Sequence, residues 1–285
     1  MGDAAGVRGP PVHPVWPGGQ RRAAGDGRSP FRPKGCELKM ILFTRLLSAE
    51  WMKLRRSAIW LLLAAGPVLA AAIGFMSLRS EMAGSRTWES LSMIMAITHG
   101  ILFLPLLAGI ISAFVCRYEH DSGGWKQLLA LPVKRGGVYL AKLAAVLLLL
   151  FISQLIYLGL VIAVGLLLGL AGPMPAADLA QSALGGFAAA APLAALQLAC
   201  SVGWANFAAP LAINAMMALP NAIIINSARY APYYPWSQPL RAMLPDAGNQ
   251  FGFLHLPAAS LYGVVAGGFL LFFLAGWLYF RRRDV

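Results

Sequence analysis

Apolar residues gather in six long segments of the chain, and this pattern predicts the fold. Each segment lacks Asp, Glu, Lys and Arg and is close to the roughly 20 residues that a helix needs to cross a membrane. A charge at the centre of such a helix costs roughly 2.5–3.5 kcal/mol on insertion, and no segment alternates like a barrel strand. The segments are residues 57–77, 93–115, 144–168, 183–202, 207–225 and 259–280. The sequence therefore predicts an all-α integral membrane protein with six transmembrane helices.

Composition and charge support this fold class and bear on the partners. Of the 285 residues, 59% are apolar and only 12% are charged, which excludes an ordinary soluble domain. The net charge of +12 comes from basic residues that flank the apolar segments. Such residues contact anionic lipid headgroups, so the charge indicates membrane lipid and not nucleic acid as a partner.

The distribution of basic residues predicts the orientation. From Arg45 onward, twelve lie on one side of the membrane, in the stretches 45–56, 117–142 and 281–283. Four lie on the other side, namely Arg79, Arg86, Arg229 and Arg241. Because Lys and Arg in short loops stay on the cytoplasmic side, we expect a multi-pass protein of the plasma membrane with both termini in the cytoplasm.

The first 39 residues differ from the rest of the chain. They are rich in Gly, Pro and Arg and show neither helical nor strand periodicity, which predicts a disordered leader at 1–39 before a six-span domain at 40–285. They contain no continuous apolar stretch, so the first span is expected to direct membrane insertion. Met40, where the composition changes, is an alternative start to Met1.

Motifs that carry catalysis or cofactors are missing from the sequence. It contains no G-x-x-x-x-G-K-[ST] phosphate loop, no H-E-x-x-H and no G-x-S-x-G, so no cofactor is predicted. Cys36, Cys116 and Cys200 share no short spacing, which favours neither a metal cluster nor a disulfide framework. His99 is the one ionisable side chain inside the six segments, where a neutral hydrogen-bond partner between helices is the commoner role.

Two cytoplasmic segments are more distinctive. Residues 46–57, LLSAEWMKLRRS, place Leu46, Leu47, Trp51 and Leu54 on one helical face, which predicts an amphipathic helix on the inner surface. A plain positive anchor for the first span is the alternative. Residues 117–142 contain a Ser-Gly-Gly turn, a short helix-compatible stretch at 125–131 that Pro132 ends, and a basic exit into the third span. A soluble partner protein can bind such a segment and so move the helices on either side.

These two segments resemble a known family. AEWMKLRRSAIWLLLAAGPVLAA (49–71) and YEHDSGGWKQLLALPVKRGGVYLAK (118–142) are similar to permease subunits of ABC-2 type transporters, closest to the lantibiotic-immunity and bacitracin-resistance group. In that group an acidic residue precedes a Gly/Thr, Trp, Lys run and a Leu-Pro-Val-x-Arg step. The resemblance extends from about Met40 to the C-terminus. Gly124 stands where that group would have Thr.

The resemblance implies a division of roles along the cytoplasmic side. It assigns a connecting helix that includes Glu50, Trp51, Lys53, Arg55 and Arg56. It also assigns an ATPase-coupling helix between spans two and three, with Glu119, Gly123, Gly124, Trp125, Lys126, Leu128 and Leu129, of which Glu119, Trp125 and Lys126 are the expected contacts.

The resemblance also implies partners and a function. ATP hydrolysis is expected in a separate ATP-binding cassette subunit and not in this chain, which would pair with a second permease chain, identical or homologous. Together they would export a peptide antibiotic or a lipid-associated compound and so provide immunity or resistance. A membrane-embedded enzyme that uses His99, and a non-transporting membrane scaffold or sensor subunit, remain the alternatives.

Overall fold

The computed structural model describes residues 35–80, 86–121, 124–125, 133–204, 206–227, 229–244 and 258–282. The chain divides into two units, Met1–Lys39 and Met40–Val285, and the second is described below. Residues 1–34 of the predicted leader lie outside the described residues, and its last five residues are helical.

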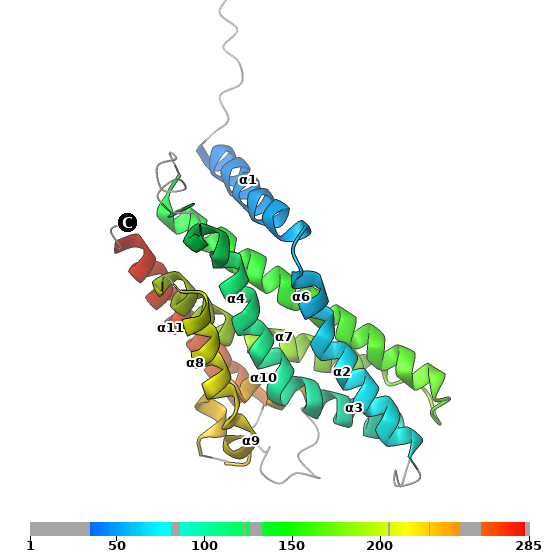
Figure 1. Cartoon of the computed structure of the whole chain (residues 1–285). Helices are drawn as coiled ribbons and strands as arrows, with labels where there is room; N and C mark the ends of the chain where they lie inside the picture. The colour runs from blue at the N-terminus through cyan, green and yellow to red at the C-terminus, as the bar shows by residue number, and fades with distance from the viewer. Residues whose placement is uncertain are drawn as a thin grey trace, which may run out of the picture. The chain divides into compact units, whose positions relative to one another are not determined.

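The described residues are helical apart from their connections and one isolated bridge between Thr87 and Ala171. Figure 1 shows the long helices of the second unit running side by side. In chain order the elements are α1 (Gly35–Arg55), α2 (Ile59–Arg79), α3 (Trp88–Thr98), the π-helical turn η1 (His99–Phe103), α4 (Leu104–Asp121), α6 (Arg135–Leu167), α7 (Ala176–Gly203), α8 (Ala208–Ala218), α9 (Asn221–Ile224), the 3-10 turn η2 (Ala231–Tyr233), α10 (Gln238–Met243) and α11 (Ala258–Arg282).

Five helices of the described chain are long and apolar enough to cross a membrane, which confirms a helical multi-pass fold. They are Ile59–Arg79, Trp88–His120, Arg135–Leu167, Ala176–Gly203 and Ser260–Arg282. Several extend beyond the predicted segments, since a helix continues through charged residues when these have partners. The helix predicted at 144–168 begins at Arg135 and so includes Lys142.

The predicted fifth span, residues 207–225, is shorter than the others. It consists of α8 and α9, which together form an apolar stretch of 17 residues, Ala208–Ile224. Pro220 lies at the break because proline has no backbone N–H to donate. At 1.5 Å per residue the stretch covers about 25 Å, against about 30 Å for the hydrocarbon core. The count of six spans therefore stays a prediction.

Two asparagines hold the short α8 and α9 against the long helices. Asn214 donates to the carbonyl oxygens of Pro105 and Leu106 on α4, at 3.1 and 3.2 Å, and accepts a hydrogen bond from Trp236. Asn221 donates to the carbonyl oxygen of Ile101 in η1 at 2.7 Å. Pro105 of α4 has no backbone N–H, so the carbonyl group of Ile101, four residues earlier, is left available, and the Asn221 amide replaces the missing bond.

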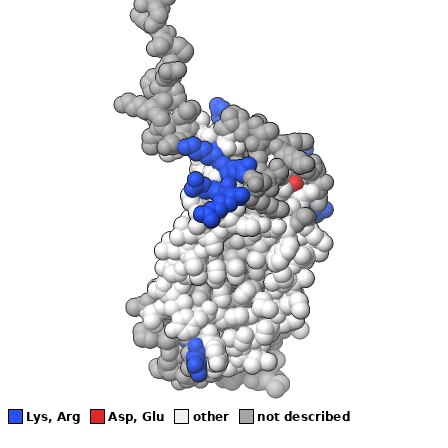
Figure 2. All heavy atoms as spheres, turned by 90° about the vertical axis from the view of Figure 1, so that its left-hand side faces the viewer, with Lys and Arg blue, Asp and Glu red and all other residues white. Residues whose placement is uncertain are grey.

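Basic side chains lie at both ends of the second unit, and an uncharged band lies between them (Figure 2). Figure 2 shows Lys and Arg gathered at one end of the visible face, a broad uncharged band, and a further basic patch at the opposite end. Large apolar side chains such as Leu61, Leu166 and Leu271 are exposed on the helices of membrane-spanning length. An apolar belt between charged ends is the surface expected of a protein in a bilayer.

Candidate functional site at the charged end of the bundle

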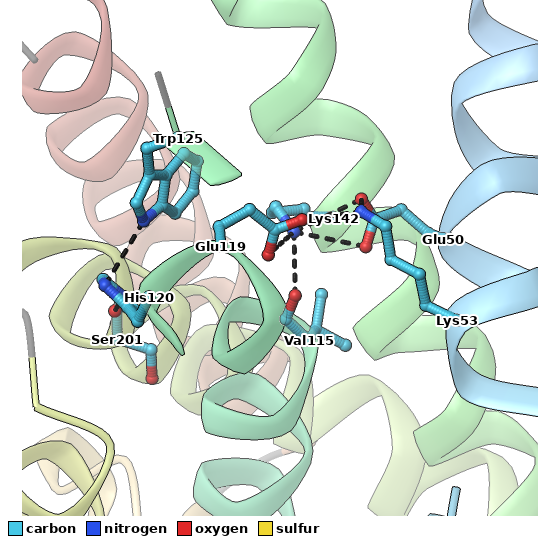
Figure 3. A network of polar contacts seen from close by, with 8 residues as sticks. All are labelled: Glu50, Lys53, Val115, Glu119, His120, Trp125, Lys142 and Ser201. Carbon is cyan, nitrogen blue, oxygen red and sulfur yellow. Dashed lines mark hydrogen bonds and ion pairs between the residues drawn. The ribbon is translucent and has the colours of Figure 1, made fainter. Parts of the chain in front are cut away.

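Four charged side chains from three helices form one ion-pair network at the basic end of the unit (Figure 3). Glu50 and Lys53 come from α1, Glu119 from α4 and Lys142 from α6. Lys53 Nζ lies 3.0 Å from Glu50 Oε1 and 2.6 Å from Glu119 Oε1. Lys142 Nζ lies 3.2 Å from Glu50 Oε2 and 2.8 Å from Glu119 Oε2. Each lysine therefore bridges both carboxylates.

Lys142 is the centre of this network. Its side chain is fully buried, and its ammonium group donates a third bond, of 2.8 Å, to the carbonyl oxygen of Val115 on α4. The ammonium group thus has hydrogen bonds to Glu50 and Val115 and an ion pair with Glu119. The position follows from the early start of α6 at Arg135, which places Lys142 inside the helix and not in the loop before it.

The network has equal numbers of positive and negative charges, and this balance allows the four side chains to be buried. Two carboxylates face two ammonium groups, and three of the four side chains are almost completely buried. A buried charge without a partner is so unfavourable that removing one member of such a pair commonly costs about 3–5 kcal/mol. Lys53 is 29% exposed. Burial lowers the pKa of Lys53, but the carboxylates of Glu50 and Glu119 outweigh burial and raise that pKa above its ordinary value.

A second set of contacts joins Trp125 to the network. The Trp125 indole Nε1 donates to His120 Nδ1 at 3.3 Å. His120 Nε2 therefore carries the proton and donates to the carbonyl oxygen of Ser201 on α7, 2.8 Å away. The Trp125 ring packs 5.3 Å from that of Phe280 on α11, and Lys142 Nζ lies 5.5 Å from the centroid of the Trp125 ring. Trp125 thus contacts three helices, α4, α6 and α11, and His120 connects α4 to α7.

The structure brings together several of the residues predicted for the two cytoplasmic helices. Glu50 and Lys53 meet Glu119 in the network, while Trp51 packs edge-on against Trp60 with ring centroids 5.5 Å apart. Arg55 and Arg56 are exposed. Gly124 and Trp125 are helical. Gly123, Lys126, Leu128 and Leu129 lie outside the described residues.

Glu119 and Trp125 were expected to face a partner protein, and the structure gives them a different setting. Glu119 is 3% exposed and Trp125 is 8% exposed. Their polar atoms are turned toward Lys53, Lys142 and His120 because these are the groups that satisfy them. A direct partner contact through either side chain stays a prediction.

Lys142, His120 and Ser201 are the residues that sequence reasoning missed. Lys142 was counted only as a basic loop residue. The available signal was the pair Glu50 and Glu119, two carboxylates beside apolar segments, since buried carboxylates need cationic partners. Nothing in the spacing tells which lysine supplies the charge, because Glu50 and Lys142 are 92 residues apart.

His99 lies away from this network, within the bundle. It is fully buried in η1, and its ring stacks on that of Tyr157 with centroids 4.9 Å apart. Gln154 is adjacent, but neither ring nitrogen of His99 makes a well-formed hydrogen bond to a described residue. In the described part of the chain no serine or threonine hydroxyl is paired with this imidazole, so no base and nucleophile pair is formed there.

Together these features define a multi-pass helical membrane protein whose charged end is held by a buried ion-pair network. The family model described as ABC-2 family transporter protein matches residues 46–221, which is more than half of the chain. The chain belongs to the ABC-2 transporter family, and it is a membrane permease subunit and not an enzyme. A comparison with curated proteins gives no match.

Proposed function

We propose that this chain is the permease subunit of an exporter that a separate ATP-binding cassette ATPase drives, and that it works beside a second permease chain. The ABC-2 family normally works with an ATPase partner, which supports this assignment. On this proposal the chain crosses the membrane six times, with α8 and α9 as a short fifth crossing, and both termini are cytoplasmic.

The observation that carries the proposal is the ion-pair network. It joins α1, the proposed connecting helix, to α4 and α6, the helices that enter and leave the proposed coupling segment at 119–131. Displacing α1 from α4 would break the 2.6 Å pair between Lys53 and Glu119 and leave charges unpaired in a buried site. A force on the coupling segment is therefore passed to three helices at once.

The individual residues then take distinct roles. Glu119 transmits motion from inside the network, and Trp125 fixes the coupling segment to α4 and α11. Lys126, Leu128 and Leu129 supply the contact with the ATPase, since an ammonium group and two leucines suit a partly apolar interface with a carboxylate partner. Gly123 and Gly124 precede them in the chain. Arg55 and Arg56, both exposed, bind lipid headgroups.

The proposed cargo is a peptide antibiotic or a lipid-associated compound, exported to the outer side to give immunity or resistance. The support for this cargo is the resemblance of residues 118–142 to the lantibiotic-immunity and bacitracin-resistance permeases. Closure of two ATPase subunits would pull the coupling segments of two permease chains and open a path between them.

The experiment compares two charge reversals at opposite ends of the unit. Lys126→Glu alters the proposed ATPase contact, whereas Arg86→Glu makes the same change at an exposed position beside α3. Each full-length tagged variant is purified from its native membranes, and vanadate-sensitive ATP hydrolysis in the eluate is measured per permease.

Wild type and Arg86→Glu are expected to elute with vanadate-sensitive hydrolysis, and Lys126→Glu is expected to lose at least about 90% of it, because a charge-assisted interface bond contributes about 1.5–3 kcal/mol. Equal ATP hydrolysis in the two variants would show that the coupling segment is not the contact with the ATPase. Hydrolysis missing from the wild-type eluate, with the permease folded, would contradict the assignment of an ATPase partner.

A further inference from the structure

A cavity of about 440 Å³ lies at the end of the unit opposite the ion-pair network. Its wall is formed by the start of α3, the connection at 171–175, the first turns of α7 and the residues that end α10. The bridge between Thr87 and Ala171 pins two of these segments together. The wall is therefore assembled from three parts of the chain that are far apart in sequence, at 87–93, 171–182 and 243–244.

The lining of this cavity is acidic although the protein is strongly basic. Glu89 and Asp178 contribute carboxylates, and no lysine or arginine is among the described lining residues. Asp178 is exposed and makes no ion pair within the described part of the chain. Both acids lie in the first turn of a helix, where each helix terminus supplies roughly half a positive charge. Asp178 therefore carries a full negative charge against about half a positive charge from its helix terminus, which leaves this part of the lining negative.

The wall also contains an unsatisfied hydrogen-bond donor. Trp88 is 6% exposed, and its indole Nε1 has no hydrogen-bond partner among the described residues. Its ring cannot move aside freely, because it packs on Gly165 so closely that a Cβ there would lie 2.2 Å from the ring. Leaving a buried donor unpaired costs about 1–3 kcal/mol. A ligand with an acceptor atom would recover this energy.

The remaining lining is mixed, with Thr87, Ser92 and Gln181 beside apolar side chains. Met93 and Met243 contribute flexible thioether side chains, which adapt to irregular hydrocarbon groups. Ser182 lies at the wall beside Tyr157, which in turn stacks on His99. The cavity thus adjoins the polar side chains in the interior of the bundle.

We propose that this cavity binds an amphipathic organic cation from the side opposite the ion-pair network. The cationic nitrogen pairs with Asp178, an acceptor atom of the ligand takes the hydrogen bond of Trp88 Nε1, and the hydrocarbon part lies on Met93 and Met243. The inference deepens the proposed function by naming a class of cargo, but the binding step needs neither ATP nor a partner.

Tetracaine is a suitable probe, since it combines a cationic amine, an ester acceptor and an alkyl chain in one small molecule. Full-length protein is placed in phosphatidylcholine nanodiscs without nucleotide, and radiolabelled tetracaine binding is measured at equilibrium above that of empty nanodiscs. Benzocaine, which keeps the ester but has no cationic amine, is the competing neutral ligand.

Wild type is expected to bind tetracaine saturably at one site per chain. Asp178→Asn is expected to weaken binding about tenfold or more, and Asp178→Glu to keep it within about threefold, because only the first loses the charge. Trp88→Phe keeps the ring and removes the donor, so it is expected to weaken binding about three- to tenfold.

Three results would overturn the inference: no saturable binding above empty nanodiscs, equal binding by wild type and Asp178→Asn, or competition by benzocaine as strong as that by tetracaine itself. An unchanged unfolding temperature for Asp178→Asn checks that a loss of binding is not a loss of folding. None of these results bears on ATPase copurification, so the inference and the proposed function can fail separately.

Discussion

The two ends of the bundle handle charge in opposite ways. At the network end, Glu50 and Glu119 are buried and each is paired with two lysines. At the cavity end, Asp178 is exposed and lacks an ion-pair partner within the described chain, and a buried tryptophan donor nearby is unsatisfied. A saturated network resists separation of its helices, whereas unsatisfied groups around a cavity favour a ligand. The difference suggests one end built to transmit force and the other to receive a molecule.

The strongest test of the network end removes its central charge. Lys142→Met leaves Glu50 and Glu119 facing one lysine, so we expect a loss of about 3–5 kcal/mol of stability, seen as a large fall in the unfolding temperature in nanodiscs. Leu148→Met, on an exposed position of the same helix, is the matched control. Adding Glu119→Gln to Lys142→Met restores the charge balance and should recover part of the loss. If Lys142→Met unfolds like wild type, the network does not hold the helices.

A second variant tests whether the short α8 and α9 depend on polar bonds. Asn214→Leu removes two donated bonds to α4 and the acceptor for Trp236. We expect a loss of about 1–3 kcal/mol, because the buried indole N–H then has no partner. Thermal unfolding beside Met216→Leu, an exposed position on the same helix, measures the effect. Equal stability of the two variants would mean that packing alone holds this segment.

The smallest expected effect concerns Lys53, the most exposed member of the network. Its pKa is raised above the ordinary 10.5, so its contribution to stability is complete below that value and is lost as the pH rises through the folded-state pKa. Lys53→Met should cost about 1 kcal/mol near pH 7, less than Lys142→Met because solvent screens a partly exposed pair.

Thermal unfolding at a series of pH values from about 8 to 12 checks the sign of this effect. The difference in stability between wild type and Lys53→Met should shrink toward the alkaline end. A difference that stays constant or grows with pH would show that the Lys53 charge is not what stabilises the wild type.

Much of the fold could be predicted because membrane insertion leaves a direct trace in the sequence. The predicted segments 57–77 and 259–280 are uncharged apolar stretches, and the structure has helices at Ile59–Arg79 and Ser260–Arg282. The break at Pro220 was less predictable, since proline inside a membrane helix is often tolerated when other groups satisfy the backbone. Asn221, which directly follows the break, ties α9 to Ile101 of η1 through a contact that no local pattern reveals.

The candidate site was predictable only in part. The resemblance assigned Glu50, Lys53 and Glu119 to the connecting and coupling helices, but it placed Glu119 on a surface that faces a partner. Its burial depends on Lys142, which the third helix carries into the bundle by beginning at Arg135. Pairing across distant helices is a property of packing, so it could not be inferred from spacing along the chain.

The claim on which all else depends is that the network end faces the cytoplasm and the cavity end faces outward. In a variant whose native cysteines are replaced, Lys134→Cys and Arg86→Cys place one exposed thiol at each end. A membrane-impermeant maleimide applied to intact cells should label the Arg86→Cys variant at once and the Lys134→Cys variant only after permeabilisation. The reverse pattern would place the proposed coupling segment outside the cell and contradict the account.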